Sequence, residues 1–97
     1  MSLPLALPRP HPALEGHFPG EPILPGAVLL DEALHAIESA EGLSGRLWRI
    51  DSVKFPAAAV DGARLLLDYE RSASGTIRFR IRDGGRLIAT GTLTAHA

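Results

Sequence analysis

Apolar and polar residues alternate along the last part of the chain, as they do in strands that bury one face of a sheet. The alternation is clearest in residues 76–83, where an arginine occupies every second position from 78 to 82. Gly84-Gly85 follows and favours a tight turn into a strand over residues 86–95. Apolar runs predict two earlier strands, over residues 47–58 and 63–72, joined by a turn at Asp61-Gly62.

Residues 25–41 show the period of an α-helix. Pro25 suits the first helical position, and Gly42 favours termination. Apolar residues cover most of the predicted helix circumference, whereas Asp31 and His35 belong to a narrow polar stripe. Because a helix that is apolar nearly all round is usually buried, we expect this helix to be central and Asp31 to be desolvated.

The region before this helix is dominated by proline. Seven of the eight prolines lie between Pro4 and Pro25, which excludes a helix there and allows at most a short edge strand. Residues 3–9 are expected to be weakly extended and residues 11–24 to form an ordered loop. One helix followed by antiparallel strands predicts an α+β fold, with residues 1–97 forming a single domain in which a curved sheet wraps around the helix.

Composition excludes several functions. The net charge of −1 leaves no basic excess for nucleic acid, and the lack of cysteine excludes disulfides and thiolate chemistry. No apolar run reaches the roughly 20 residues that span a membrane, and the proline-rich start is unlike a signal peptide. We therefore expect a soluble, cytoplasmic protein. The charge is uneven, since residues 1–45 carry −5 and the remainder carries +4.

Three groups suited to acid–base chemistry lie in residues 16–32. His17 titrates near neutrality and can move a proton, and three prolines and three glycines in this stretch hold it in an ordered loop. Asp31 would act as an acid if it were desolvated. Gly26 offers a backbone N–H at the helix start, without an intrahelical acceptor. A base, an acid and an oxyanion donor are the parts needed to remove a proton beside a carbonyl and expel a β-hydroxyl.

The sequence Gly-His-Phe-Pro-Gly at residues 16–20, Pro-Ile-Leu-Pro-Gly at residues 22–26 and an acid fourteen residues after the histidine resemble the β-hydroxyacyl-acyl-carrier-protein dehydratases of fatty acid synthesis. The likeness continues at residues 53–55 and 60–62 and covers about residues 14–95. With only sixteen residues before His17, the chain looks similar to the short dehydratase-like domains of aryl-polyene and other specialised lipid pathways. The resemblance implies the hotdog fold, a curved antiparallel sheet around one long helix.

The resemblance also implies roles for particular residues. His17 would be the catalytic base, Asp31 the acid that handles the hydroxyl and water, and the Gly26 N–H the group that polarises the thioester carbonyl. The neighbouring residues expected to contact the substrate are Phe18, Pro25 and His35. The reaction implied is the dehydration of 3-hydroxyacyl thioesters on an acyl carrier protein to trans-2-enoyl thioesters, without a cofactor. In the family, the histidine and the acid of one site come from different subunits, so we expect a homodimer.

His35 departs from the family pattern, which often has glutamine four residues after the acid. A neutral His35 could hydrogen-bond to Asp31, whereas a charged His35 would lower the pKa of Asp31 and oppose its role as an acid. We therefore expect His35 to be neutral. An alternative is that His17, Asp31 and His35 bind a metal ion, since two histidines and a carboxylate are suitable ligands; we expect no metal.

Arg78, Arg80 and Arg82 should project from one strand face. They could form a docking patch for an acidic carrier protein, or they could be a solvated sheet edge that discourages aggregation. Two other functions also remain open. One is a hotdog thioesterase, which would hydrolyse the thioester, and the other is a non-catalytic hotdog protein that only binds an acyl carrier or a larger partner.

Overall fold

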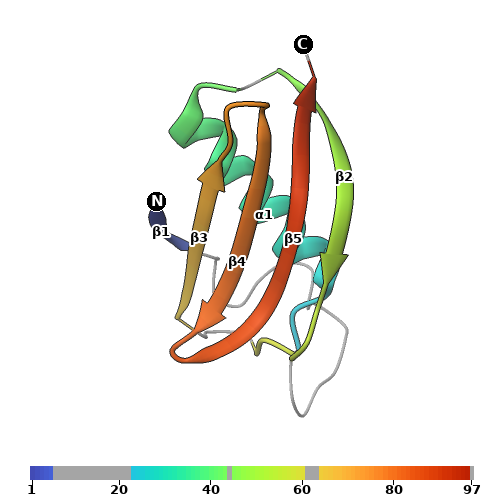
Figure 1. The fold of residues 1–97 in the computed structure, drawn as a ribbon. Helices are drawn as coiled ribbons and strands as arrows, with labels where there is room; N and C mark the ends of the chain where they lie inside the picture. The colour runs from blue at the N-terminus through green and yellow to red at the C-terminus, as the bar shows by residue number, and fades with distance from the viewer. Residues whose placement is uncertain (6–22, 44, 61–63, 97) are drawn as a thin grey trace.

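The structure is a computed structural model that describes residues 1–5, 23–43, 45–60 and 64–96. In this part of the chain, a five-stranded antiparallel sheet curves across one face of a helix (Figure 1). The elements are β1 (Ser2–Leu5), α1 (Gly26–Glu41), β2 (Leu47–Lys54), β3 (Leu65–Arg71), β4 (Thr76–Asp83) and β5 (Arg86–His96). The predicted α+β fold, with a sheet curved around a helix, is confirmed.

The sheet has the strand order β1-β3-β4-β5-β2, so β4 is its middle strand. The predicted hairpin is confirmed, since Asp83 pairs with Arg86 across Gly84-Gly85 and Gly84 has a φ of 61°. The alternation seen in the sequence corresponds to the two sheet faces: Ile77, Phe79 and Ile81 are buried beneath the helix, and the arginines between them point outward. This pattern fixes the register of β4, because a slip of one residue would bury the arginines.

The two edges of the sheet differ in length and protection. β1 has four residues and includes Pro4, which has no N–H for a further strand, so this edge matches the short proline-containing strand that the sequence predicts. β2 has eight residues and no proline. It stops at Lys54 rather than at residue 58, because Pro56 lacks the N–H that a ladder needs and restricts the backbone of Phe55 before it.

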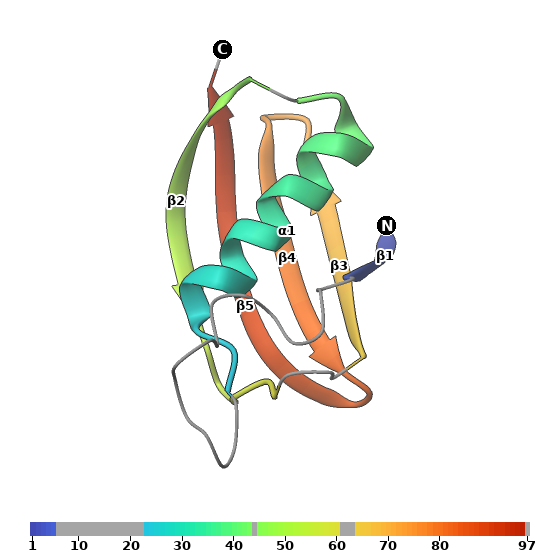
Figure 2. The same ribbon diagram turned by 180° about the vertical axis from the view of Figure 1, so that it is seen from behind.

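Helix α1 crosses the sheet diagonally, from the β2 side at its start to the β3 side at its end, and lies in front of the sheet in Figure 2. Its fully buried residues are Leu29, Ala33 and Ile37, which lie four residues apart on one face. The helix ends where Gly42 adopts a left-handed conformation (φ 67°, ψ 34°) and donates its N–H to the carbonyl of Glu38. The prediction that the helix is buried nearly all round is wrong for the single chain, because the sheet covers only one side.

Two carboxylates on the last turns of α1 connect the helix to opposite parts of the sheet. Trp48 Nε1 donates a 2.7 Å hydrogen bond to Glu38 Oε1, and the Tyr69 hydroxyl donates one of 2.7 Å to Glu41 Oε2. The Tyr69 hydrogen bond, opposed by desolvation and helped by nearby Arg71, lowers the pKa of Glu41. Burial and the Glu41 carboxylate raise the pKa of Tyr69 to about 12. None of the described helices is long and apolar enough to cross a membrane.

Candidate active site

The start of α1 offers backbone donors that its own helix cannot use. Pro25 is the N-cap residue and has no side-chain capping bond, while its carbonyl accepts from Val28 N (3.0 Å) and Leu29 N (3.2 Å). Within the described residues, the N–H groups of Gly26 and Ala27 have no acceptor. These two donors at the positive end of the helix dipole can therefore bind an oxygen that carries negative charge.

A short bridge fixes the chain just before these donors. Leu24 N donates a 2.8 Å hydrogen bond to the Ala59 carbonyl, and Ile23 forms an isolated antiparallel bridge with Val60. The Leu24 side chain is buried in the core. The segment after β2 thus holds the entry to the helix, and so the direction of the Gly26 N–H, in one position.

An apolar pocket of about 360 Å³ opens beside the helix start. Its walls come from Ile23, Leu24, Gly26, Leu29 and residues 55–59. The Phe55 ring lies directly over Gly26, so that a Cβ at Gly26 would be only 2.8 Å from Phe55 Cζ. Glycine is required for this close approach of ring and backbone, and the pocket is suited to an apolar chain whose polar end reaches the free N–H groups.

Of the residues that line this pocket, sequence reasoning assigned only Gly26 to the site, and Phe55 is the main residue that it missed. The available signal was its position before Pro56, at a point where a strand must end, and within the Lys-Phe pair of the family resemblance. Pro25, which was predicted to contact substrate, is exposed at the helix start beside the pocket.

Asp31 and His35 lie one turn apart on the uncovered face of α1. Asp31 Oδ2 is 3.8 Å from His35 Nδ1, and the two side chains are 64% and 65% exposed, respectively. The expectation that Asp31 is desolvated is therefore wrong for the single chain, because no element of the sheet reaches this face. Asp31 also does not line the pocket beside Gly26.

His17 and Phe18, the predicted base and its neighbour in the substrate site, lie outside the described residues. The structure accordingly brings together Asp31 with His35, and Gly26 with the apolar pocket. Among the described residues, no three histidine, aspartate or glutamate side chains gather in a group that could hold a metal. Since the metal alternative includes His17, it stays a hypothesis.

Arg78, Arg80 and Arg82 project from β4 onto the face of the sheet opposite α1. Because β4 is the middle strand, the alternative is wrong in placing these arginines at a sheet edge, although Arg78 and Arg80 are exposed as it expects. Arg82 Nε lies 3.5 Å from Asp68 Oδ2 on β3, so this arginine has an ion-pair partner within its own chain.

Comparison with known proteins places this architecture in a family. The model of the ApeI-like family, described as ApeI dehydratase, matches residues 1–92. The 3-hydroxyacyl-[acyl-carrier-protein] dehydratase FabZ of Syntrophomonas wolfei is 33% identical over 69 residues, which are 64% of this chain and 48% of that protein. FabZ of Enterococcus faecalis is 28% identical over 91 residues, 82% of this chain and 64% of that protein. The chain thus spans between about half and two thirds of these curated relatives.

Among solved structures, the dehydratase heterocomplex ApeI:P from Xenorhabdus doucetiae matches with a TM-score of 0.83 and 24% identity, over 99% of this chain and 86% of that one. This likeness confirms the hotdog fold that the sequence resemblance implies. With the family model covering nearly the whole chain, we conclude that the chain belongs to the ApeI-like dehydratase family.

Proposed function

We propose that this protein is a hydro-lyase that removes water from 3-hydroxyacyl thioesters carried on an acyl carrier protein and yields trans-2-enoyl thioesters. The observation that carries the proposal is the start of α1, where Gly26 lines an apolar pocket and its N–H has no acceptor among the described residues. Membership of the ApeI-like family and the names of the FabZ relatives support the reaction class. Residues 1–97 act as one hotdog domain, and the chemistry uses no cofactor.

In the proposed reaction, His17 takes the proton from the carbon next to the thioester carbonyl. Electron density moves onto the carbonyl oxygen, where the Gly26 N–H stabilises the enolate. The enolate then collapses to form the carbon–carbon double bond, and the C–O bond to the hydroxyl breaks as Asp31 donates a proton to it. Water leaves, and proton transfer from the His17 imidazolium to the Asp31 carboxylate, directly or through solvent, restores both groups.

The active form that we propose is a homodimer in which Asp31 of one chain serves the pocket of the other. Two observations support it: Asp31 is exposed and does not line the pocket of its own chain, and one edge of the sheet is unprotected. Along that edge, Leu47 on β2 is 73% exposed and Ile50 is 47% exposed. An eight-residue edge strand with exposed apolar side chains favours antiparallel pairing with another strand. Burial in such a dimer would desolvate Asp31, as the acid role requires.

A direct test is to incubate the purified protein with a 3-hydroxyacyl thioester on holo acyl carrier protein and to follow the acyl mass. The wild-type chain should convert the substrate to a product 18 mass units lighter, as expected for the loss of one water. His17→Ala and Asp31→Asn should each lower kcat by about 10²–10⁴-fold, the usual contribution of a positioned acid or base. Mixing the two variants should restore part of the activity, because a mixed dimer contains one intact site.

The same assay distinguishes the alternatives. Release of a free carrier thiol would show a thioesterase, and binding of the carrier without turnover, across several chain lengths, would show a non-catalytic subunit. The solved relative is described as a heterocomplex, which is a second candidate arrangement. Activity that appears only after a different hotdog chain is added would replace the homodimer by that arrangement.

A further inference from the structure

The sheet face opposite α1 is polar, and its charges are sorted by strand. This outer face is turned toward the viewer in Figure 1. Residues directly opposite one another in the ladders form rows across the sheet, with Asp68, Arg80, Thr90 and Lys54 in one row and Glu70, Arg78, Thr92 and Ser52 in the next. Acids therefore lie on β3, arginines on β4, hydroxyls on β5, and a lysine at the end of β2.

These two rows line a shallow hollow of about 630 Å³, which we call the outer hollow. Its rim includes Arg78, Arg80 and Lys54, whose charged groups have no ion-pair partner among the described residues. Glu70 is the acid of the rim that also has no ion pair there, whereas Asp68 is engaged by Arg82. The outer hollow thus keeps an excess of positive charge.

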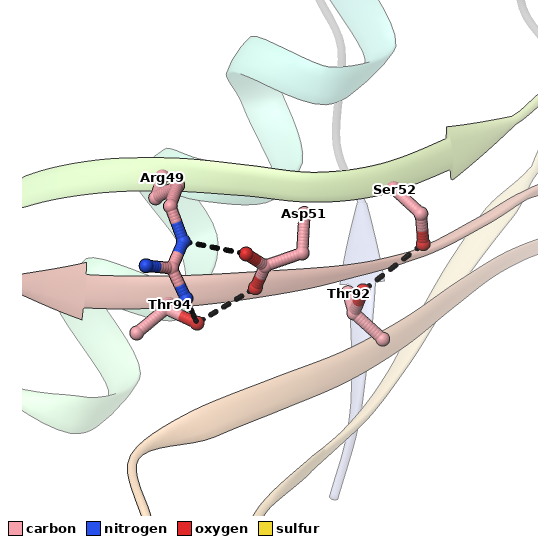
Figure 3. Close-up of polar contacts among 5 residues, drawn as sticks. All are labelled: Arg49, Asp51, Ser52, Thr92 and Thr94. Carbon is pink, nitrogen blue, oxygen red and sulfur yellow. Dashed lines mark hydrogen bonds and ion pairs between the residues drawn. The ribbon is translucent and has the colours of Figure 1, made fainter.

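Neighbouring polar groups on the same face are satisfied within the sheet and do not compete for these cations. Arg49 Nε donates to Asp51 Oδ1 at 2.6 Å, and Thr94 Oγ1 donates to Asp51 Oδ2 at 2.7 Å (Figure 3). The hydroxyls of Ser52 and Thr92 are 3.0 Å apart and bond to each other. This network occupies Asp51, so the nearest acid on β2 is already neutralised by Arg49.

The opposite side of the molecule has the opposite charge. Helix α1 carries Asp31, Glu32, Glu38 and Glu41 and contains neither lysine nor arginine. The helix layer, turned toward the viewer in Figure 2, is therefore acidic, while the outer hollow is basic. A molecule with charge divided in this way is oriented as it meets a charged partner, because an acidic surface is attracted to the outer face and repelled from the helix.

We propose that the outer hollow docks an acidic surface of the acyl carrier protein, with Arg78, Arg80 and Lys54 as its contacts. This inference rests on the proposed function, which supplies the carrier as the form of the substrate. Arg82 takes no part, since it is paired with Asp68. The unpaired cations of the hollow suit carboxylates on a protein surface, which accept charge-assisted hydrogen bonds from arginine and lysine.

Docking at this place also puts the carrier next to the candidate active site. Lys54 lines the outer hollow and Phe55 lines the apolar pocket at the helix start, although these surfaces lie on different sides of the sheet. Consecutive Cα atoms are about 3.8 Å apart, so the two sites meet at the end of β2. A thioester on the flexible arm of a carrier seated over Lys54 has only to pass around that strand end to reach the Gly26 N–H.

The test compares two variants with the same change in net charge. Arg78→Glu with Arg80→Glu reverses the outer hollow, whereas Arg46→Glu with Arg86→Glu reverses two exposed arginines that do not line it. Binding of unloaded holo carrier protein is measured by titration calorimetry at low and moderate salt. The hollow variant should bind the carrier roughly tenfold or more weakly than the wild type, and its affinity should no longer depend on salt. The control variant should bind the carrier with nearly wild-type affinity. Far-UV circular dichroism confirms that both variants are folded, and Arg78→Gln with Arg80→Gln gives a milder version.

Turnover then separates this proposal from the proposed function. With carrier-linked substrate, the hollow variant should raise KM by roughly the same factor as it weakens binding, and with a short soluble thioester its kcat/KM should match the wild type. Equal weakening of carrier binding by the hollow and control variants, or no weakening by either, would overturn the docking site even if dehydration is observed. Hollow-dependent binding by a wild-type protein that dehydrates neither substrate would support the docking site and reject the activity.

Discussion

Replacing Gly26 by alanine tests whether the close contact with Phe55 or the approach of substrate requires glycine at the helix start. A Cβ added at Gly26 would lie 2.8, 3.0 and 3.1 Å from three carbons of the Phe55 ring. Carbon atoms in ordinary contact are about 3.5–4.0 Å apart, so the ring would have to move by about 0.7 Å or more. Because the new group points into the pocket, the substitution affects packing and the candidate site together.

The expected change in stability is small, for two opposing reasons. Overpacking typically costs about 1–3 kcal/mol, and Phe55 should fall at the low end because it is 43% exposed and can turn toward solvent. Alanine in a helix regains up to about 1 kcal/mol relative to glycine. We therefore expect Gly26→Ala to change the free energy of unfolding by less than about 1 kcal/mol, while the ring is displaced from its place over the backbone.

A double-mutant cycle isolates the contact. Gly26→Ala is measured by urea denaturation in the wild-type chain and in a chain that carries Phe55→Ala. Without the ring, the three closest contacts of the new Cβ are removed, so the second measurement should show a gain of about 0.5–1 kcal/mol. The resulting coupling of about 1 kcal/mol exceeds the 0.3–0.5 kcal/mol within which independent sites add. Dehydratase turnover, measured on the same four proteins, should fall with Gly26→Ala in both backgrounds, by up to about 10²–10³-fold if access to the oxyanion donor is lost.

The same free-energy change in both backgrounds would show that Phe55 is not the reason for glycine at this position. Turnover that returns to its reference value when Phe55→Ala is combined with Gly26→Ala would show that the ring, rather than the new methyl group, blocks the site. The second result would reject the assignment of the Gly26 N–H as a donor that substrate must approach closely.

Three further outcomes follow from the described contacts. Gly91→Ala should lower the free energy of unfolding by about 3 kcal/mol in urea denaturation, because the new Cβ would overlap the backbone carbonyl oxygen of Ser52, which cannot rotate away. A decrease below about 0.5 kcal/mol would contradict this prediction. Folding raises the pKa of Tyr69 from 10.0 to about 12, so the free energy of unfolding should decline by up to about 2.7 kcal/mol as the pH rises from below 10 to 12. Tyr69→Phe should remove this decline, and it also loses the hydrogen bond to Glu41. Ile50→Asp should leave a folded monomer at concentrations where the wild type sediments as a dimer; an unchanged dimer would rule out pairing through β2.

Much of the fold was predictable because strong local signals agreed with one another. The two glycines at 84–85, the alternation through β4 and the proline at position 25 each specify a turn, a face or a helix start without reference to distant residues. The end of β2 had a local signal in Pro56, which the predicted strand over residues 47–58 ran past. What the sequence does not show is that residues 55–58, after the strand, form one wall of a pocket.

The candidate site was predictable from its residue types but not from its surroundings. The sequence predicts an unused N–H at Gly26, and in the described part of the chain this N–H has no acceptor and lies beside an apolar pocket. The sequence does not reveal that Phe55, from a distant segment, lies over Gly26, because this contact depends on the curvature of the sheet, which brings the end of β2 to the helix. The desolvation of Asp31 was inferred from the apolar residues around it on the helix, many of which are only partly buried in the single chain.

The apolar surface that the single chain leaves uncovered has a common explanation. Three apolar side chains are exposed on or just after β2: Leu47, Ile50 and Phe55. Helix α1 begins on this same side of the sheet, and Asp31 lies on its uncovered face. Hydrophobic periodicity reports which residues avoid water, but it does not report whether the covering surface belongs to the same chain. The helix that the sequence predicts to be buried nearly all round is therefore consistent with the structure if the second covering surface is another subunit. That subunit would supply at once the burial that the pattern requires and the desolvation that Asp31 needs as an acid.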